Sequence, residues 1–225
     1  MEDLEPTEGN SLILKYENYP IVRSLIQLVP FGIGSAIDVA LMGKINNMKT
    51  ERTRVFFDKI LENNIALKEE QLEDKEFLHA YFATTKAYLN TQRHEKIQLF
   101  AQLFSRYCEK GIFEAIDDYE ESLSILDELS YREFEILLIL NEFENKNPIK
   151  EGQNYLQRAL VYWENFINQI EQDIGLLREE IPGVLERINR TGLYQTFTGG
   201  FMDYTGDVGK LTPNFQRFLK ELDLV

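Results

Sequence analysis

Apolar side chains recur at three- and four-residue steps along the middle of the chain, residues 93–140. The first set is Ile97, Phe100, Ala101, Phe104 and Cys108. The second set, after Gly111 and an acidic start at Asp117 and Asp118, is Tyr119, Leu123 and Leu126. Residues spaced in this way share one face of a helix, and carboxylates in a first turn favour the helix dipole. The pattern therefore predicts two helices, each with a buried apolar face.

A third helix is predicted directly after them. Ser130 and Glu133 have the spacing of a capping box, in which hydroxyl and carboxylate satisfy free backbone N–H groups at a helix start. The residues that follow, 134–140, are apolar nearly all round. Because a helix of that kind belongs at the centre of a bundle, we expect residues 134–140 to form the middle of the core.

The N-terminal region is polar at first and then unusually apolar. Residues 1–17 form a polar lead that we expect to be partly disordered, and Tyr19-Pro20 is a helix start signal. Residues 24–37 carry no charge, but Pro30, Gly32 and Gly34 interrupt them. A membrane-spanning helix needs about 20 uninterrupted apolar residues. The pattern therefore favours two short helices that meet at residues 30–34.

Composition leaves open whether residues 21–42 are buried or exposed. One interpretation is a buried helical hairpin. The other is an exposed surface for a partner protein or a membrane, because a long uncharged run can serve as a docking surface. In the second case the contact residues would include Phe31, Ile33 and Ile37.

Two further helical stretches are predicted. The first, residues 50–89, shows apolar faces with a break near residues 63–64 or 68–70. The second is a long helix that runs to about Arg178. It follows residues 145–148, Asn-Lys-Asn-Pro, which end the preceding helix. In the first stretch, the expected buried positions are Val55, Phe56, Ile60, Leu72, Phe77, Tyr81, Phe82 and Leu89. In the second, they are Leu156, Leu160, Trp163, Phe166, Ile167, Ile170 and Ile174.

Residues 179–225 have a different character. Residues 181–193 predict a short helix that ends at Gly192, with Val184, Leu185 and Ile188 facing inward. Residues 193–197 and 201–204 alternate like two strands of a hairpin, and Thr212-Pro213 begins a last helix. This order resembles the end of winged helix-turn-helix domains. The candidate contact residues here are Arg187, Arg190 and Lys210.

The net charge of −14 opposes a large nucleic-acid footprint, because binding to phosphates depends on clustered Lys and Arg. The acidity is concentrated in the helical body, since the chain from Arg178 onward holds six basic and seven acidic residues. The predicted reading helix mixes both signs, so a duplex would be repelled about as much as attracted. We therefore expect no nucleic-acid partner, and DNA binding through residues 179–225 is the runner-up.

Few residues offer chemistry. Glu76 and His79 have the spacing of half a carboxylate-bridged di-metal site, but His94, the other histidine, has Thr91 three residues before it. Cys108, the single cysteine, lies on a predicted core face, suits a reducing cytoplasm and excludes an internal disulfide. The first residues lack the layout of a secretion signal. We expect a cytoplasmic protein with no catalytic residues and no metal.

Three glycine-containing stretches resemble cofactor motifs only superficially. Gly32 and Gly34 could open a dinucleotide fingerprint, but Ile37 replaces its third glycine and no βαβ unit surrounds it. Gly43-Lys44 and Gly209-Lys210 lack the upstream glycine and the following hydroxyl of a phosphate loop. No cofactor is expected.

The three central segments, EKIQLFAQL, DDYEESLSILDELS and YREFEILLIL, together resemble bacterial helical proteins of unknown function, including the abortive-infection alpha family. The likeness rests on a leucine-serine-x-x-glutamate phrase before an apolar helix and covers about a third of the chain. It implies a bacterial or phage-related protein with a role in phage defence. No catalytic residues carry over from it.

Together these patterns predict a mainly α protein: a polar lead (1–17), a helical bundle (18–178) and a small α+β winged-helix-like module (179–225). The expected function is that of a non-enzymatic interaction protein, whose partner is another protein or a second copy of the chain. The alternatives are a winged-helix DNA-binding regulator and a membrane-acting effector that uses residues 21–42.

Overall fold

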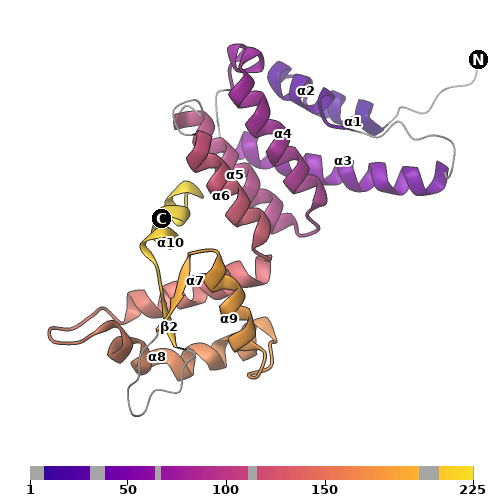
Figure 1. The fold of residues 1–225 in the computed structure, drawn as a ribbon. Helices are drawn as coiled ribbons and strands as arrows, with labels where there is room; N and C mark the ends of the chain where they lie inside the picture. Colours follow the sequence, from indigo (N-terminus) through magenta and orange to yellow (C-terminus); the bar gives the residue numbers. More distant parts are fainter. Residues whose placement is uncertain (1–7, 31–38, 64–66, 111–115, 198–207, 225) are drawn as a thin grey trace, which may run out of the picture. The chain divides into compact units, whose positions relative to one another are not determined.

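The computed structural model describes residues 8–30, 39–63, 67–110, 116–197 and 208–224 (Figure 1). Within them the protein is mainly helical, as predicted, with ten α-helices and a two-stranded antiparallel hairpin that is followed by the last helix. The chain forms two compact units. The first is Met1–Ser124 with Glu221–Asp223, and the second is Ile125–Lys220 with Leu224–Val225. The boundary predicted at residue 178 lies inside the second unit.

The first unit is built from helices. They are α1 (Glu8–Lys15), α2 (Pro20–Gln27), α3 (Val39–Glu62), the 3-10 helix η1 (Glu69–Glu73), α4 (Lys75–Asn90), α5 (His94–Lys110) and the first part of α6 (Ile116–Glu128). Part of the predicted polar lead is ordered as α1, because Leu12 and Tyr16, one helical turn apart, are both buried. Helix α2 begins at Pro20, as predicted.

Helix α3 is longer than the sequence suggested. We expected a short helix after Gly34 and a new helical stretch from Thr50, but α3 runs without a break from Val39 to Glu62. A single glycine inside a helix costs only about 1 kcal/mol, so Gly43 does not end it. The predicted junction at residues 30–34 lies mostly outside the described residues.

Aromatic rings form the core of the first unit. The ring of Phe104, on α5, lies within 6.5 Å of four other ring centroids. These four are Phe56, Phe77, Tyr81 and Tyr119, and all are fully buried. The prediction that Phe82 is buried was wrong, since 47% of this residue is exposed. Its neighbour Tyr81 is fully buried and donates a hydrogen bond to the Leu25 carbonyl.

The second unit holds the remaining elements. They are α7 (Tyr131–Lys146), α8 (Tyr155–Gln169), the π-helix η3 (Ile170–Ile174), α9 (Ile181–Arg190), β1 (Tyr194–Thr196), β2 (Gly209–Leu211) and α10 (Pro213–Glu221). The predicted capping box of α7 is present, with Ser130 Oγ accepting from the Glu133 N–H and Glu133 accepting from the Ser130 N–H. Phe134, Ile136, Leu137 and Leu140 of α7 are buried, which makes the predicted segment the core of this unit.

The hairpin differs from its prediction. β1 pairs with Gly209–Leu211, with Tyr194 opposite Leu211, and not with residues 201–204, which lie outside the described residues. Pairing with β2 is favoured by a tertiary contact, because the Leu211 N–H donates to Glu144 Oε1 of α7 at 2.9 Å. Helix α10 begins at Pro213, as predicted. The Thr212 hydroxyl donates to the Gly192 carbonyl at 2.6 Å.

Gly209 is required by the ring that covers it. An alanine Cβ at this position would overlap the ring and hydroxyl of Tyr194, which is buried. Because overpacking a core costs about 1–3 kcal/mol, Gly209→Ala should destabilise the second unit by that amount. Urea unfolding followed by the fluorescence of Trp163, the single tryptophan, measures this.

Gly183→Ala is the matched control. Gly183 lies inside α9, and its Cβ position has no neighbour within 4 Å. Alanine is favoured over glycine in a helix by about 0.5–1 kcal/mol, so this variant should be slightly more stable than the wild type. Equal effects of the two substitutions would contradict the packing of Tyr194 on Gly209.

Candidate functional site

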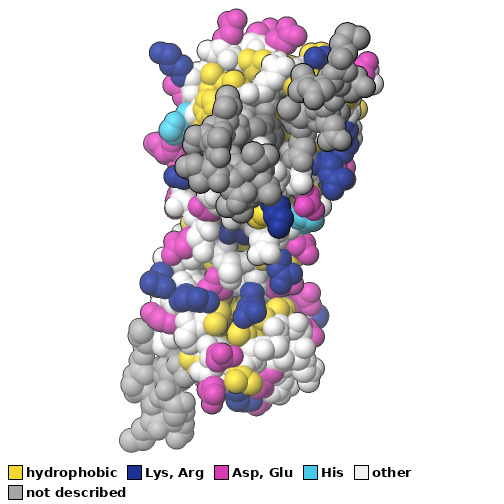
Figure 2. Space-filling view, turned by 90° about the vertical axis from the view of Figure 1, so that its right-hand side faces the viewer, with side chains coloured by type: hydrophobic (Ala, Val, Ile, Leu, Met, Phe, Trp, Pro, Cys, Tyr) yellow, Lys and Arg dark blue, Asp and Glu magenta, His cyan; other side chains and the backbone are white. Residues whose placement is uncertain are grey.

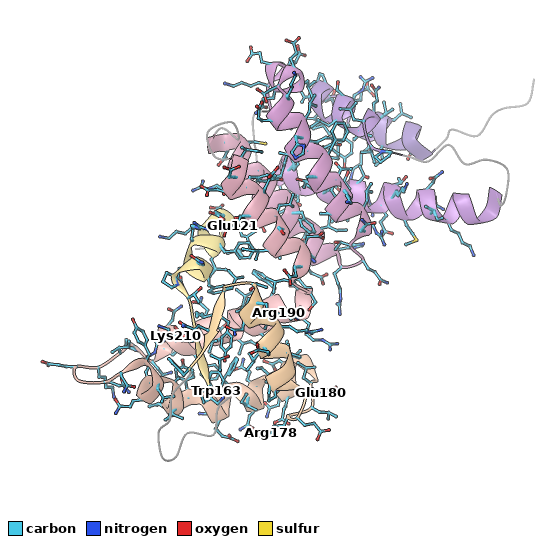
Figure 3. All side chains as sticks on the ribbon, in the orientation of Figure 1. Glu121, Trp163, Arg178, Glu180, Arg190 and Lys210 are labelled. Atoms are coloured by element: carbon cyan, nitrogen blue, oxygen red, sulfur yellow. The ribbon has the colours of Figure 1, made fainter. Side chains whose placement is uncertain are left out.

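The predicted contact residues of the C-terminal region are held by different neighbours. Arg187 Nη2 lies 3.0 Å from Glu133 Oε1, the same carboxylate that caps α7. The Lys210 ammonium lies 3.9 Å from the ring centroid of Tyr155, on α8. Arg190 is exposed at the end of α9 (Figure 3). The contacts of Arg187 and Lys210 therefore bind α9 to α7 and β2 to α8.

The charges around these residues have both signs. Figure 2 shows Lys and Arg side chains interspersed with Asp and Glu side chains on one face of the unit that carries α7 to α9. A surface of this kind does not have the clustered positive charge on which phosphate binding depends. On that face, positive and negative groups therefore lie side by side.

The described part of the apolar N-terminal segment is largely buried, although Leu28 is 41% exposed. Phe31, Ile33 and Ile37 lie outside the described residues. Of the earlier part of the segment, Val22, Leu25, Ile26 and Val29 are buried, and the Tyr81 hydroxyl donates to the Leu25 carbonyl at 2.7 Å. None of the helices in the described part of the chain is both long and apolar enough to cross a bilayer.

The residues considered for chemistry make local contacts in the first unit. His79 Nε2 lies 3.0 Å from Glu120 Oε1, and His94 Nε2 lies 3.2 Å from Glu51 Oε1, all on exposed side chains. Burial raises the pKa of the Cys108 thiol well above its usual range, which favours the protonated form. Among the described residues, no three His, Cys, Asp or Glu side chains are grouped so as to hold a metal ion.

An open polar cavity of about 90 Å³ also lies in the first unit. Its lining residues are Asn63, Gln102, Ser105, Arg106, Glu109 and Asp223. Asn63 Nδ2 donates to Ser105 Oγ at 3.1 Å, so the hydroxyl is held by an amide and not by a base. This arrangement does not activate the serine as a nucleophile.

The clearest candidate site is an apolar surface on α8, in the second unit. Leu156, Leu160, Trp163 and Ile167, which we call the α8 stripe, follow one another at steps of four, three and four residues. The sequence predicted that all four are buried, but 56% of Leu160 is exposed and both Leu156 and Trp163 are half-buried. Only Ile167 is buried, with 8% exposed. Leu160 is therefore the exposed centre of the stripe, flanked by the half-buried Leu156 and Trp163.

A buried ion pair fixes the rotation of α8. Arg158 Nη2 lies 2.6 Å from Glu144 Oε2 of α7, and the two side chains are only 11% and 14% exposed. Glu144 Oε1 accepts the N–H of Leu211, so one carboxylate joins α7, α8 and β2. Burial and the Glu144 charge raise the pKa of the neighbouring Tyr162 to about 12. With Arg158, Ala159, Tyr162 and Phe166 inward, the α8 stripe lies at the edge of the buried face.

Sequence reasoning did not find this site. The apolar spacing of the stripe is the same whether a helix faces the core of its own chain or a partner, so periodicity could not separate the two cases. The one signal in the sequence for the exposure of Leu160 was Arg158, two positions before it. Burial of this charged residue rotates α8 so that Leu160 faces outward. Its partner Glu144 lies on another helix, which the sequence does not pair with α8.

The fold and this surface together define a mainly helical protein with an exposed apolar helix face. No protein-family model, curated protein or solved structure matches the chain. The resemblance to the abortive-infection alpha family therefore stays a prediction from the central segments.

Proposed function

We propose that this chain is a non-enzymatic protein-interaction protein that binds its partner through the α8 stripe. The observation that carries the proposal is the exposure of Leu160 at the centre of four apolar side chains with helix-pairing spacing. Single exposed apolar residues are common on protein surfaces, but a contiguous apolar face is typical of an interaction site. The resemblance of the central helices suggests that the partner belongs to a bacterial phage-defence or stress system.

The other residues considered support this proposal by their contacts. The two histidines pair with exposed glutamates, and the Cys108 thiol is kept protonated by burial. Of the residues proposed for DNA binding, Arg187 is paired with Glu133 and Lys210 lies on Tyr155. Release of residues 21–42 onto a membrane would expose Val22, Leu25 and Ile26, which are buried in the first unit. These contacts favour a scaffold over an enzyme, a DNA-binding regulator or a membrane effector.

Leu160→Glu should abolish partner binding, because it places a charge at the centre of a surface that must lose its water on binding. The measurement is affinity capture from lysate of the source cells with tagged wild-type and variant proteins, followed by quantitative mass spectrometry. We expect the specific partner to be depleted at least about tenfold with Leu160→Glu, a loss of about 1.4 kcal/mol.

Val161→Glu is the matched control. Val161 is the next residue on α8 and is 65% exposed, but it lies about 100° around the helix from Leu160 and outside the stripe. It should capture the partner as the wild type does. Equal capture by wild-type protein and Leu160→Glu would show that the stripe is not the interaction surface.

A further inference from the structure

We propose that the partner of the α8 stripe is the same stripe on a second copy of this chain, packed in antiparallel orientation. This inference rests on the proposed function, because it names the partner of that surface. The 4-3-4 spacing is that of a helix–helix seam, in which side chains of one helix fill the spaces between those of the other. An antiparallel pair related by a two-fold axis uses the same surface on both copies, so the assembly stops at a dimer.

The local charge permits two copies to approach here. With a net charge of −14, two copies of the chain repel each other in general. Between Glu151 and Glu164, however, Arg158 is the single charged residue, and its buried ion pair with Glu144 neutralises it. The stripe thus lies in an uncharged stretch of an acidic protein, as an interface between identical copies requires.

The two ends of α8 carry complementary charge. Around its N-terminal end lie Lys150, Glu151 and Lys210, with a net positive charge. Around its C-terminal end lie Glu164, Glu171, Asp173 and Arg178, with a net negative charge even though Arg178 pairs with two of the carboxylates. Antiparallel packing brings each basic end beside the acidic end of the other copy and opposes the helix dipoles favourably. Parallel packing would bring like charges together.

The packing can be specified by residue. The two-fold axis then crosses the pair of helices at the level of the Val161–Tyr162 peptide bond. Leu160 of one copy lies beside Trp163 of the other, and Leu156 lies beside Ile167. The interface would cover the remaining exposed part of Trp163, the half-buried single tryptophan of the chain. Because a one-helix interface is smaller than the roughly 1,200 Å² of standard interfaces, we expect a Kd on the order of 10–100 µM.

Sedimentation equilibrium of the purified full chain tests this inference. The wild type should form dimers as its concentration passes through that range, and the emission of Trp163 should shift to shorter wavelength as water leaves its ring. Leu160→Glu should raise the Kd at least about tenfold, and Val161→Glu should leave it within about threefold. A wild type that stays monomeric at millimolar concentration, or a Leu160→Glu variant that dimerises as well as the wild type, would overturn the inference.

Oxidative cross-linking tests the orientation in a Cys108→Ala background. Leu160→Cys should form a dimer through its own disulfide, because this position lies close to the axis. Leu156→Cys should not, since at 1.5 Å per residue its two copies are about 16 Å apart along the helices, beyond the roughly 7 Å limit between Cα atoms. A disulfide between two copies of Leu156→Cys would show parallel packing and overturn the proposal.

The two proposals can fail separately. If the purified chain is monomeric and Leu160→Glu still loses a partner captured from lysate, self-pairing is wrong and the interaction function stands. If the chain neither dimerises nor loses any captured protein on Leu160→Glu, both proposals are wrong.

Discussion

Glu144→Ala is expected to lower the free energy of unfolding of the second unit by about 3–5 kcal/mol, the usual cost of breaking a buried ion pair at one partner. The substitution leaves the Arg158 guanidinium buried without its carboxylate, and it also leaves the Leu211 N–H without its acceptor. Urea unfolding followed by Trp163 fluorescence reports on this unit directly, because Trp163 and Arg158 lie on the same helix, α8. Loss of the pair should also change the rotation of α8.

Three variants separate the contributions. Glu142→Ala, on the same helix, removes an ion pair with Lys146 whose side chains are 62% and 70% exposed, and it should cost about 0.5 kcal/mol or less. Glu144→Gln keeps an acceptor for the Leu211 N–H but removes the charge. Adding Arg158→Met to Glu144→Gln should recover more than half of the loss, because no buried charge is then left unpaired. If Glu144→Ala costs no more than Glu142→Ala, the pair does not hold α7, α8 and β2 together.

Phe104→Ala should destabilise the first unit by about 3–5 kcal/mol, the range measured for large-to-small aromatic changes in protein cores. The ring lies at the centre of the aromatic core, with centroids of Phe56, Phe77, Tyr81 and Tyr119 between 5.6 and 6.5 Å away. Removing the Phe104 ring leaves a cavity. The four neighbouring rings belong to three different helices, so they cannot all move inward to fill it. Amide hydrogen exchange of peptides from α3, α4 and α5 measures the effect within this unit.

Phe82→Ala is the control for Phe104→Ala. It removes a ring of the same size from the same unit, but Phe82 is nearly half exposed and contacts Tyr81 at the edge of the core. We expect a loss below about 1 kcal/mol, because little apolar area returns to water. Phe104→Leu should fall between the two variants. Equal protection in Phe104→Ala and Phe82→Ala would contradict the central position of Phe104.

Local signals in the sequence determined several of the helix boundaries. Pro20 begins α2, the Ser130–Glu133 capping box begins α7, and Pro213 begins α10. Gly192, at φ 75°, follows the end of α9, where the sequence placed the stop. These signals act over three or four residues, through backbone hydrogen bonds and allowed dihedral angles. They can therefore be recognised without knowing what the helix packs against.

The tertiary structure alone decided which faces are covered. Leu160 and Phe82 have the spacing of core residues, yet both are exposed, because helix rotation depends on contacts such as that between Arg158 and Glu144. The partner strand of β1 was likewise selected by a hydrogen bond from Leu211 to Glu144, 67 residues away in the chain. Periodicity records that a helix has an apolar side, and the burial of that side by the chain itself or by a partner depends on distant residues. The sequence thus determined that this protein is built mainly from helices, and the packing of the second unit determined that α8 presents an apolar stripe.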